Sequence, residues 1–167
     1  MGHIVSLKTI KQIIPEIKNV GDRVVLTHGA FDILHIGHIE FLRESKEKGQ
    51  VLIVGIESDK RIAEYKGISR PIIPFDQRMR LVSKIQFVDF VFPITDKNPF
   101  NDELYMKMYD NLQPNILTYG RNYGAEKQRK ATKDYFTDIK FEKILTEFDK
   151  LQSTTKIIEK IITSGQN

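Results

Sequence analysis

The 167-residue sequence contains no cysteine and no tryptophan. Without cysteine it forms no disulfide, and it lacks the thiolate ligands that structural zinc sites favour. No apolar run approaches the roughly 20 residues that a membrane-spanning helix needs. The opening residues, Met1-Gly2-His3, show no signal peptide. These absences predict a cytoplasmic protein with no membrane partner.

Positive charge is in small excess, because 26 Lys and Arg residues against 22 Asp and Glu residues give a net charge of +4. Hydrophobic residues at 40% and charged residues at 29% are ordinary for a globular protein. The length fits one domain, 1–167, with a core of its own. A site for anionic small molecules explains the modest basic excess, and we find no nucleic-acid-binding motif. We therefore predict no nucleic-acid partner.

Short β-branched or aromatic runs alternate with helical segments along the chain. The predicted strands cover residues 24–26, 51–56, 90–94, 116–118 and 139–144. The predicted helices cover residues 7–17, 39–48, 59–65, 75–85, 102–111 and 126–135, and a last one opens at Ser153. Pro15 is a candidate early stop in the first helix. The alternation predicts an α/β fold, a doubly wound (Rossmann-like) parallel sheet with helices on both faces and ligands at the carboxyl ends of its strands.

The most informative stretch joins the first predicted strand to the next helix. It places Gly29-Ala30-Phe31-Asp32 just before two histidines, His35 and His38, that flank Gly37. A glycine there allows a large anion to approach the backbone, and a helix N-terminus favours phosphate. Zinc would need three or four ligands, and the only other histidines are His3 and His28. The pattern indicates phosphoryl or nucleotidyl transfer, with no metal held by the protein.

Two further segments have the composition of anion sites. Lys66 and Arg70 lie in a basic loop with turn residues and could neutralise the phosphate of a second substrate or a pyrophosphate. Residues 153–155, Ser-Thr-Thr, open the last predicted helix with more hydroxyls than an N-cap requires. For Asp32 two alternatives stay open: fixing the loop through backbone N–H groups, which we favour, or holding Mg²⁺.

The block Gly-Ala-Phe-Asp-Ile-Leu-His-Ile-Gly-His at residues 29–38 resembles the signature of the cytidylyltransferase-like nucleotidyltransferases. Further blocks stand in the order of that family, at residues 55–59, 66–71, 74–78, 88–89 and 153–157. The opening Ile-Val-Ser-Leu and the Gly-x-x-Arg-Pro block are most similar to the heptose-1-phosphate adenylyltransferase domain of bacterial ADP-heptose synthesis. The resemblance extends from about His3 to Ile162.

This resemblance implies a nucleotidyltransferase that joins ATP to a sugar phosphate, a heptose-1-phosphate first of all, and releases pyrophosphate. Mg²⁺ is expected as the cofactor, bound mainly through the nucleotide phosphates, and a separate sugar kinase is expected in the pathway. The implied catalytic residues are His35, His38, Lys66 and Arg70. The implied nucleotide-binding residues are Gly29, Ala30, Phe31, Gly37, Arg78, Gly120, Ser153, Thr154 and Thr155. For Arg78 a salt bridge with Asp76 or Asp89 is the alternative.

One block departs from that branch and leaves other functions open. Residues 118–123 are Thr-Tyr-Gly-Arg-Asn-Tyr where the heptose enzymes have Lys-Gly-Gly-Asp-Tyr, so Arg121 and Asn122 replace family residues near the expected base and ribose site. A CTP-dependent cytidylyltransferase acting on glycerol-3-phosphate or a similar alcohol phosphate is one alternative. A catalytically silent nucleotide-binding module is another.

The sequence also permits a homodimer. Apolar side chains gather on the predicted helix over residues 102–111, where they fit either a dimer interface or the core: Tyr105, Met106, Met108 and Tyr109. Core packing is the favoured interpretation.

Overall fold

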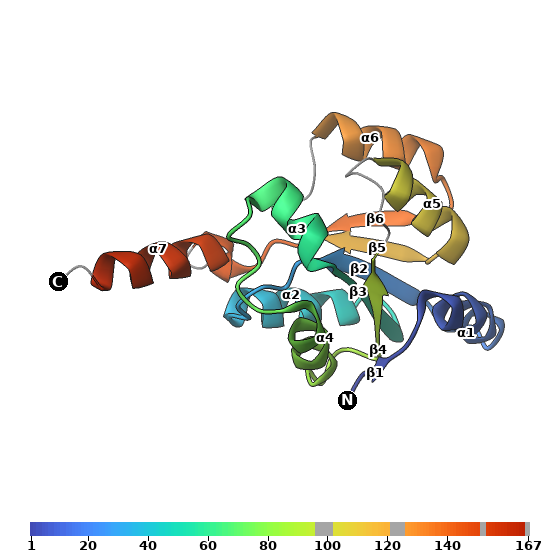
Figure 1. The fold of residues 1–167 in the computed structure, drawn as a ribbon. Helices are drawn as coiled ribbons and strands as arrows, with labels where there is room; N and C mark the ends of the chain where they lie inside the picture. The colour runs from blue at the N-terminus through green and yellow to red at the C-terminus, as the bar shows by residue number, and fades with distance from the viewer. Residues whose placement is uncertain (96–101, 121–125, 151–152, 166–167) are drawn as a thin grey trace.

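The computed structural model describes residues 1–95, 102–120, 126–150 and 153–165. Within them, six parallel strands form one sheet in the order β1-β4-β3-β2-β5-β6 (Figure 1). In chain order the strands are β1 His3–Ile4, β2 Val24–Gly29, β3 Val51–Glu57, β4 Phe90–Ile94, β5 Ile116–Tyr119 and β6 Lys140–Lys143. The chain continues from β2 to β3 on one side and returns to β5 on the other. This reversal at β2 confirms the predicted doubly wound fold.

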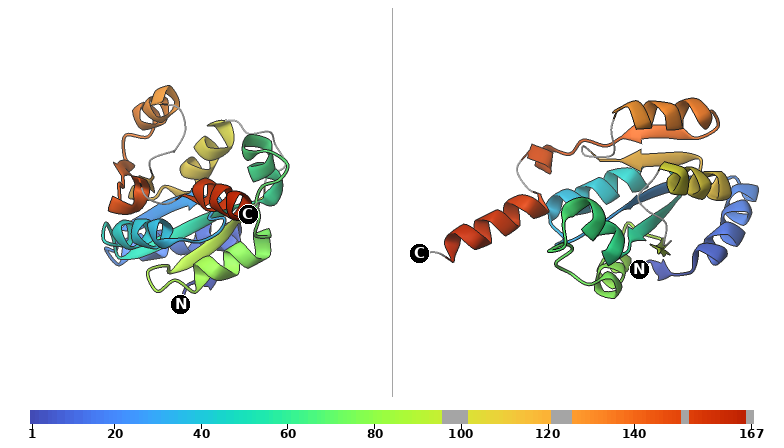
Figure 2. Two further views of the ribbon diagram at one scale, coloured as in Figure 1. Left: turned by 90° about the vertical axis from the view of Figure 1, so that its left-hand side faces the viewer. Right: turned by 45° about the horizontal axis from the view of Figure 1, so that its top comes forward.

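Helices cover both faces of the sheet, as predicted (Figure 2). On one face lie α1 Leu7–Asn19, α5 Asp102–Leu112 and α6 Glu126–Tyr135 (Figure 1). On the other pack α2 Ile36–Lys46 and α4 Phe75–Ser83. Successive residues of β2 alternate between these layers, since Val24 and Leu26 join the first and Val25 joins the second.

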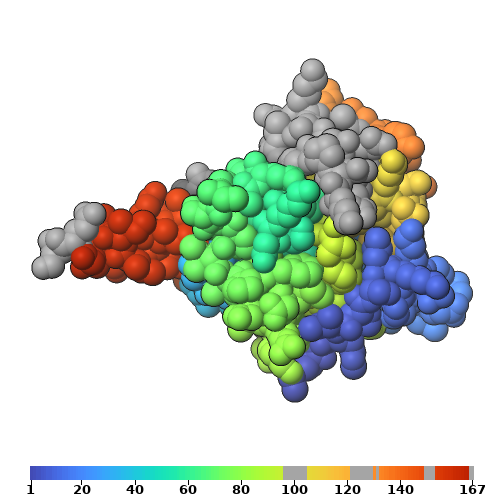
Figure 3. All heavy atoms as spheres, viewed as in Figure 1, coloured from blue at the N-terminus to red at the C-terminus, as the bar shows by residue number. Residues whose placement is uncertain are grey.

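The remaining helical segments are α3 Asp59–Lys66, a short 3₁₀ turn at Glu147–Lys150 and α7 Thr154–Ser164. Helix α7 stands out from the body of the molecule (Figure 3). Thr154, at its start, is its buried residue, whereas Ile161 and Ile162 are 64% and 57% exposed. Its first turn therefore fixes its position on the rest of the chain. No helix in the described ranges has the length and apolar character to cross a membrane.

Three of the differences from the sequence-based expectation have a clear physical reason. The edge strand β1, of two residues, was not predicted because so short a run has no measurable periodicity. Helix α1 continues through Pro15 to Asn19, because the ring is exposed while Ile10 and Ile14 hold the opposite side of the helix in the core. Helix α2 begins at Ile36 rather than Ile39, so both Gly37 and His38 belong to its first turn.

The apolar residues of α5 lie in the core. Tyr105, Met108 and Tyr109 are buried, and Met106 packs against the same cluster. Core packing is thus confirmed for these side chains, and a homodimer stays a prediction without them.

Gly55 provides a test of how closely the sheet packs beneath the site. A Cβ at Gly55 would lie 2.7 Å from Ile94 Cδ1, 2.9 Å from Phe92 Cζ and 3.1 Å from His28 Cβ. We expect Gly55→Ala to lower the free energy of unfolding by about 1–3 kcal/mol through overpacking. Urea unfolding checks this, with Gly165→Ala as the control, because its Cβ would meet no atom closer than 3.6 Å. Equal midpoints for the two variants would contradict the expectation.

Candidate active site

The loop between β2 and α2, residues 30–35, lies at the carboxyl end of β2, where the strand order reverses. Two of its residues have left-handed backbone angles, φ 47° at Phe31 and φ 42° at Ile33. Such angles cost free energy in residues other than glycine and persist only where the surroundings impose them. The ring of Phe31 is buried in the core cluster under α2 and α4. The loop is therefore a fixed rather than a relaxed turn.

Asp32 supplies much of that constraint. Its carboxylate, 1% exposed, accepts hydrogen bonds from Ile72 N at 3.0 Å, Ile73 N at 2.9 Å and Arg70 Nε at 2.9 Å. Burial by itself would raise the pKa of Asp32, but these backbone donors and the Arg70 guanidinium outweigh it and lower the pKa. Asp32 thus joins its loop to residues 70–73. Because both oxygens have these partners, the geometry favours the loop-fixing alternative over a magnesium ligand.

Arg70 occupies a position that differs from the predicted one. Its Nη2 lies 2.7 Å from Asp32 Oδ2, and its side chain is largely buried. The prediction gave this guanidinium to a phosphate, whereas the structure pairs its charge with a carboxylate of the same chain. As described, Arg70 acts on the site by holding the loop.

His35 and His38 lie against each other at the start of α2, as the motif predicts. Their rings stack with centroids 3.9 Å apart, and the Phe31 ring lies 5.5 Å from that of His38. A Cβ at Gly37 would lie 3.0 Å from His35 Cε1, so the glycine makes room for this arrangement. Burial lowers the pKa of His38 to about 3, with the charges of His35 and Lys66 adding to the effect. At neutral pH His38 is therefore an uncharged hydrogen-bond donor or acceptor.

The start of α7 contacts the same loop, although it is 122 residues away in sequence. Thr154 Oγ1 donates to the backbone carbonyl of Asp32 at 2.7 Å. Ser153 caps the helix by accepting from Lys156 N at 3.2 Å, and Thr155 is exposed beside them. The two predicted phosphate-binding helix starts, α2 and α7, are thus brought together.

Lys66 ends α3 and faces solvent on the histidine side of the site. Crowding by surrounding protein atoms lowers the pKa of its ammonium group, and the neighbouring charge of Arg70 lowers it further. The Lys66 charge acts in turn on His38. Lys66 and His38 therefore share one electrostatic environment.

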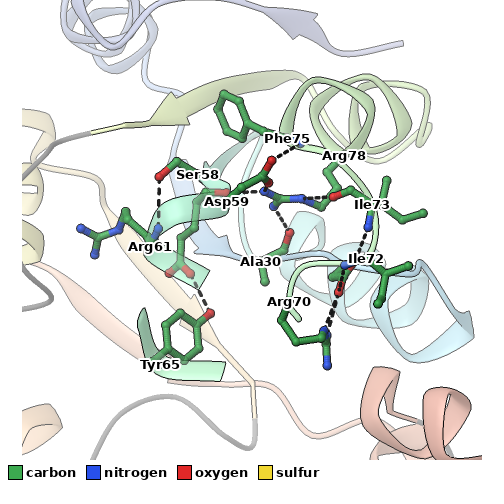
Figure 4. Close-up of polar contacts among 12 residues, drawn as sticks. Ala30, Ser58, Asp59, Arg61, Tyr65, Arg70, Ile72, Ile73, Phe75 and Arg78 are labelled. Carbon is green, nitrogen blue, oxygen red and sulfur yellow. Dashed lines mark hydrogen bonds and ion pairs between the residues drawn. The ribbon is translucent and has the colours of Figure 1, made fainter. Parts of the chain in front are cut away.

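Arg78 has an environment that the sequence did not predict. Its side chain is 0% exposed and donates to Glu57 O at 2.7 Å, to Ile73 O at 2.9 Å and to the carbonyl of Ala30 (Figure 4). Its ion pair, at 2.7 Å, is with Asp59. It pairs with neither Asp76 nor Asp89, and the expected nucleotide contact is corrected to a positioning role. No local pattern could show contacts that span up to 48 residues.

The other predicted nucleotide-binding residues lie at the switch point between β2 and β5. Thr27 Oγ1 donates to Thr118 O at 3.1 Å and ties the two strands together. Gly29 ends β2, and Gly120 follows β5 beside Phe41. Arg121, Asn122 and Tyr123 lie outside the described residues.

A polar cluster that sequence reasoning missed lies beside this site. Its members are His28, Glu57, Arg61, Tyr65 and Tyr105, and we call it the Glu57 cluster. Burial would raise the pKa of Glu57, but the nearby His28 and the hydrogen bonds from Tyr105 and Tyr65 outweigh it and lower the pKa to about 2. Glu57 ends an apolar strand, so its polarity at that position was the available indication.

Among the described residues, no group of three or more His, Cys, Asp or Glu side chains could hold a metal ion. The site instead offers imidazoles, hydroxyls, helix N-termini and Lys66. Such groups bind phosphate oxygens, so magnesium bound through the nucleotide phosphates stays the expectation.

Comparisons with known proteins identify the family of this chain. Residues 26–161 match the family model described as cytidylyltransferase-like. The match spans most of the chain, and this protein therefore belongs to the cytidylyltransferase-like family. The predicted resemblance and, at the level of the family, the predicted class of nucleotidyltransferase are confirmed.

Curated relatives include proteins named "Bifunctional protein HldE". The one from Sulfurimonas denitrificans is 36% identical over 160 residues, which are 96% of this chain and 31% of the relative. The one from Geotalea uraniireducens is 33% identical over 164 residues, 97% of this chain and 31% of the relative. This chain thus spans about a third of the length of these relatives.

Solved structures show the same architecture. A lipopolysaccharide core biosynthesis protein from Thermoplasma volcanium aligns with a TM-score of 0.60 and 28% identity, over 76% of this chain and 98% of that one. A pantoate-beta-alanine ligase from Francisella tularensis aligns with a TM-score of 0.67 and 18% identity, over 95% of this chain and 76% of that one. The second match shows the fold alone.

The buried His38 gives stability a pH dependence that can be measured. The pKa of His38 is about 3 in the folded chain, whereas its ordinary value is 6.5. Below pH 6.5 the unfolded chain therefore binds more protons than the folded chain, and the free energy of unfolding decreases as the pH is lowered. We expect wild type to lose on the order of 1 kcal/mol between pH 6.5 and 5.5. The free energy of unfolding of His38→Asn, measured by urea titration, should fall distinctly less between about pH 6.5 and 5.5. His3→Asn, at an exposed histidine, should behave as wild type; equal slopes for all three proteins would contradict this assignment.

Proposed function

We propose that this chain transfers the adenylyl group of ATP to a sugar 1-phosphate, with a heptose-1-phosphate as the leading acceptor, and releases pyrophosphate. The observation that supports this best is the stacked His35–His38 pair at the start of α2, held against the start of α7. Helix N-termini and neutral imidazoles suit a triphosphate. The names of the HldE relatives and of the lipopolysaccharide core protein support the sugar acceptor.

The reaction needs little covalent help from the protein. An acceptor phosphate oxygen attacks the α-phosphorus in line, the bond from the α-phosphorus to the bridging oxygen breaks, and pyrophosphate leaves with that electron pair. A phosphate monoester is largely ionised near pH 7, since its second pKa is about 6, so no strong base is required. Catalysis then consists of positioning and charge stabilisation.

The residues of this chain divide those tasks. His38, uncharged at neutral pH, donates a hydrogen bond to an α-phosphate oxygen as its charge grows, and His35 beside it contacts the same phosphates. Thr155 and the free N–H groups at the start of α7 bind the distal phosphates. Lys66 offsets the repulsion between nucleotide and acceptor. Magnesium, when bound with the nucleotide, would neutralise further phosphate charge.

An acceptor of this kind must be phosphorylated before it reaches the site. We therefore propose a sugar kinase reaction as the step that supplies it. A cytoplasmic location, where ATP is abundant, fits this chemistry.

Pyrophosphate release tests the proposal directly. ATP, CTP, GTP and UTP are crossed with heptose-1-phosphates, other sugar-1-phosphates and glycerol-3-phosphate in the presence of Mg²⁺. We expect release with ATP and a sugar-1-phosphate. Release with CTP and glycerol-3-phosphate would replace the proposal with the cytidylyltransferase alternative. Nucleotide binding without turnover across the panel would favour the silent module.

The histidine assignment has its own test. His38→Ala should lower kcat about 100-fold to 1,000-fold, the usual loss for one preorganised donor at a developing charge. Circular dichroism and the urea midpoint show whether the variant folds. His3→Ala, which alters an exposed histidine of β1, should keep wild-type turnover. A folded His38→Ala variant with normal kcat would remove that residue from the mechanism.

A further inference from the structure

The Glu57 cluster lies at the carboxyl edge of the sheet, one strand away from the histidine loop. Strand β3 pairs with β2 so that Gly29 stands opposite Ile56, and Glu57 is therefore the next residue along that edge. Arg78 joins the two positions, because its guanidinium binds both the carbonyl of Ala30 and the carbonyl of Glu57. The cluster is thus held in a fixed relation to the site of transfer.

Glu57 is the centre of the cluster. Its carboxylate, 4% exposed, accepts from Tyr105 Oη at 2.5 Å and from Tyr65 Oη at 2.8 Å. His28 Nδ1 lies 3.8 Å from the same carboxylate. A carboxylate offers about four lone-pair positions. By this count the carboxylate has the capacity for one more hydroxyl donor.

The outer edge of the cluster reaches the surface. Tyr65 is 42% exposed although its hydroxyl contacts the buried carboxylate. Lys66 follows it on α3, with Nζ 5.5 Å from the Tyr65 ring centroid. In Figure 4, Arg61 and Tyr65 point to the side of α3 away from Arg78. A hydroxyl-binding group and a cation that can bind phosphate are therefore adjacent on one helix.

The charges in the cluster bear on whether it binds an acceptor with an ammonium group or one with neutral hydroxyls. A carboxylate among tyrosines would also suit an ammonium group. Here a cation is already present, since Arg61 Cζ lies 5.2 Å from the Tyr105 ring centroid. Because a guanidinium already lies over the Tyr105 ring, neutral hydroxyls fit the cluster better than the second cation of an amino-alcohol.

We infer that the Glu57 cluster is the subsite that recognises hydroxyl groups of a phosphorylated polyhydroxy acceptor, with Lys66 beside it for the acceptor phosphate. This inference rests on the proposed function and adds to it the residues that select the acceptor. Glu57 and Tyr65 are its specificity-determining groups. An acceptor hydroxyl donates to Glu57 at the edge marked by Tyr65, and the Arg78 contacts set the distance from there to the transfer site.

Steady-state kinetics of the full chain test the inference. With ATP and the sugar-1-phosphate that wild type uses, Glu57→Gln should raise the acceptor KM roughly 10-fold to 100-fold, because a charged hydrogen-bond acceptor is lost. The KM for ATP should stay within about twofold of wild type. A structural role alone would not separate the two KM values in this way.

A milder variant guards against loss of folding in Glu57→Gln. Tyr65→Phe removes one hydroxyl from a half-exposed ring and should raise the acceptor KM roughly 3-fold to 10-fold. Tyr135→Phe, a matched change on the exposed Tyr135 of α6, should leave both KM values unchanged.

The kinetics distinguish a failure of the inference from a failure of the proposed function. If wild type turns over but both cluster variants keep its acceptor KM, the inference is overturned and the proposed function stands. If both KM values rise together in Tyr65→Phe, the cluster is structural and the inference is likewise overturned. If wild type releases pyrophosphate with no sugar phosphate, the proposed function fails and the inference fails with it.

Discussion

The buried carboxylate of Asp32 is the interaction on which the site depends. A carboxylate that is almost wholly removed from water is tolerated only when it is paired and hydrogen-bonded. Asp32 meets that condition with Arg70 and two backbone N–H groups, while its own carbonyl accepts from Thr154. Three segments distant in sequence therefore meet at one residue. The left-handed backbone angles at Phe31 and Ile33 persist because both ends of the loop are held in this way.

Arg78 is a buried cation with a role like that of the buried carboxylate of Asp32. It binds the carbonyls that end β2 and β3 and the carboxylate of Asp59, so it sets the distance between neighbouring strand ends. Buried ion pairs add little net stability, because desolvation offsets much of the attraction, but they impose a definite geometry. Two of the basic residues in the predicted site thus hold its framework, Arg70 through the Asp32 carboxylate and Arg78 through backbone carbonyls. In the proposed function, the groups that contact ligand are the imidazoles, the helix starts and Lys66.

The sequence predicted what depends on local pattern and missed what depends on distant pairing. Five of the six strands, the helices and the doubly wound order follow from period and from connection rules. The His35–His38 pair was predictable because its members lie three residues apart at a helix start. The start of α2 was placed three residues late, since Gly37 is a poor helix former and the tertiary contacts of His35 are invisible in sequence. The pairing of Arg70 with Asp32, 38 residues away, and the contacts of Arg78 required the fold.

The distribution of charge then explains how such a site can hold two anions at once. If every basic residue near the loop pointed into the site, the empty protein would have to keep several like charges together at a large electrostatic cost. Here Arg70 and Arg78 are neutralised by Asp32 and Asp59, and His38 is uncharged. Lys66 stays exposed at the edge, with a lowered pKa that reflects the remaining crowding. In the proposed function, the attraction for phosphate comes instead from backbone dipoles and oriented donors that are already in place, and such groups need no reorganisation when charge develops.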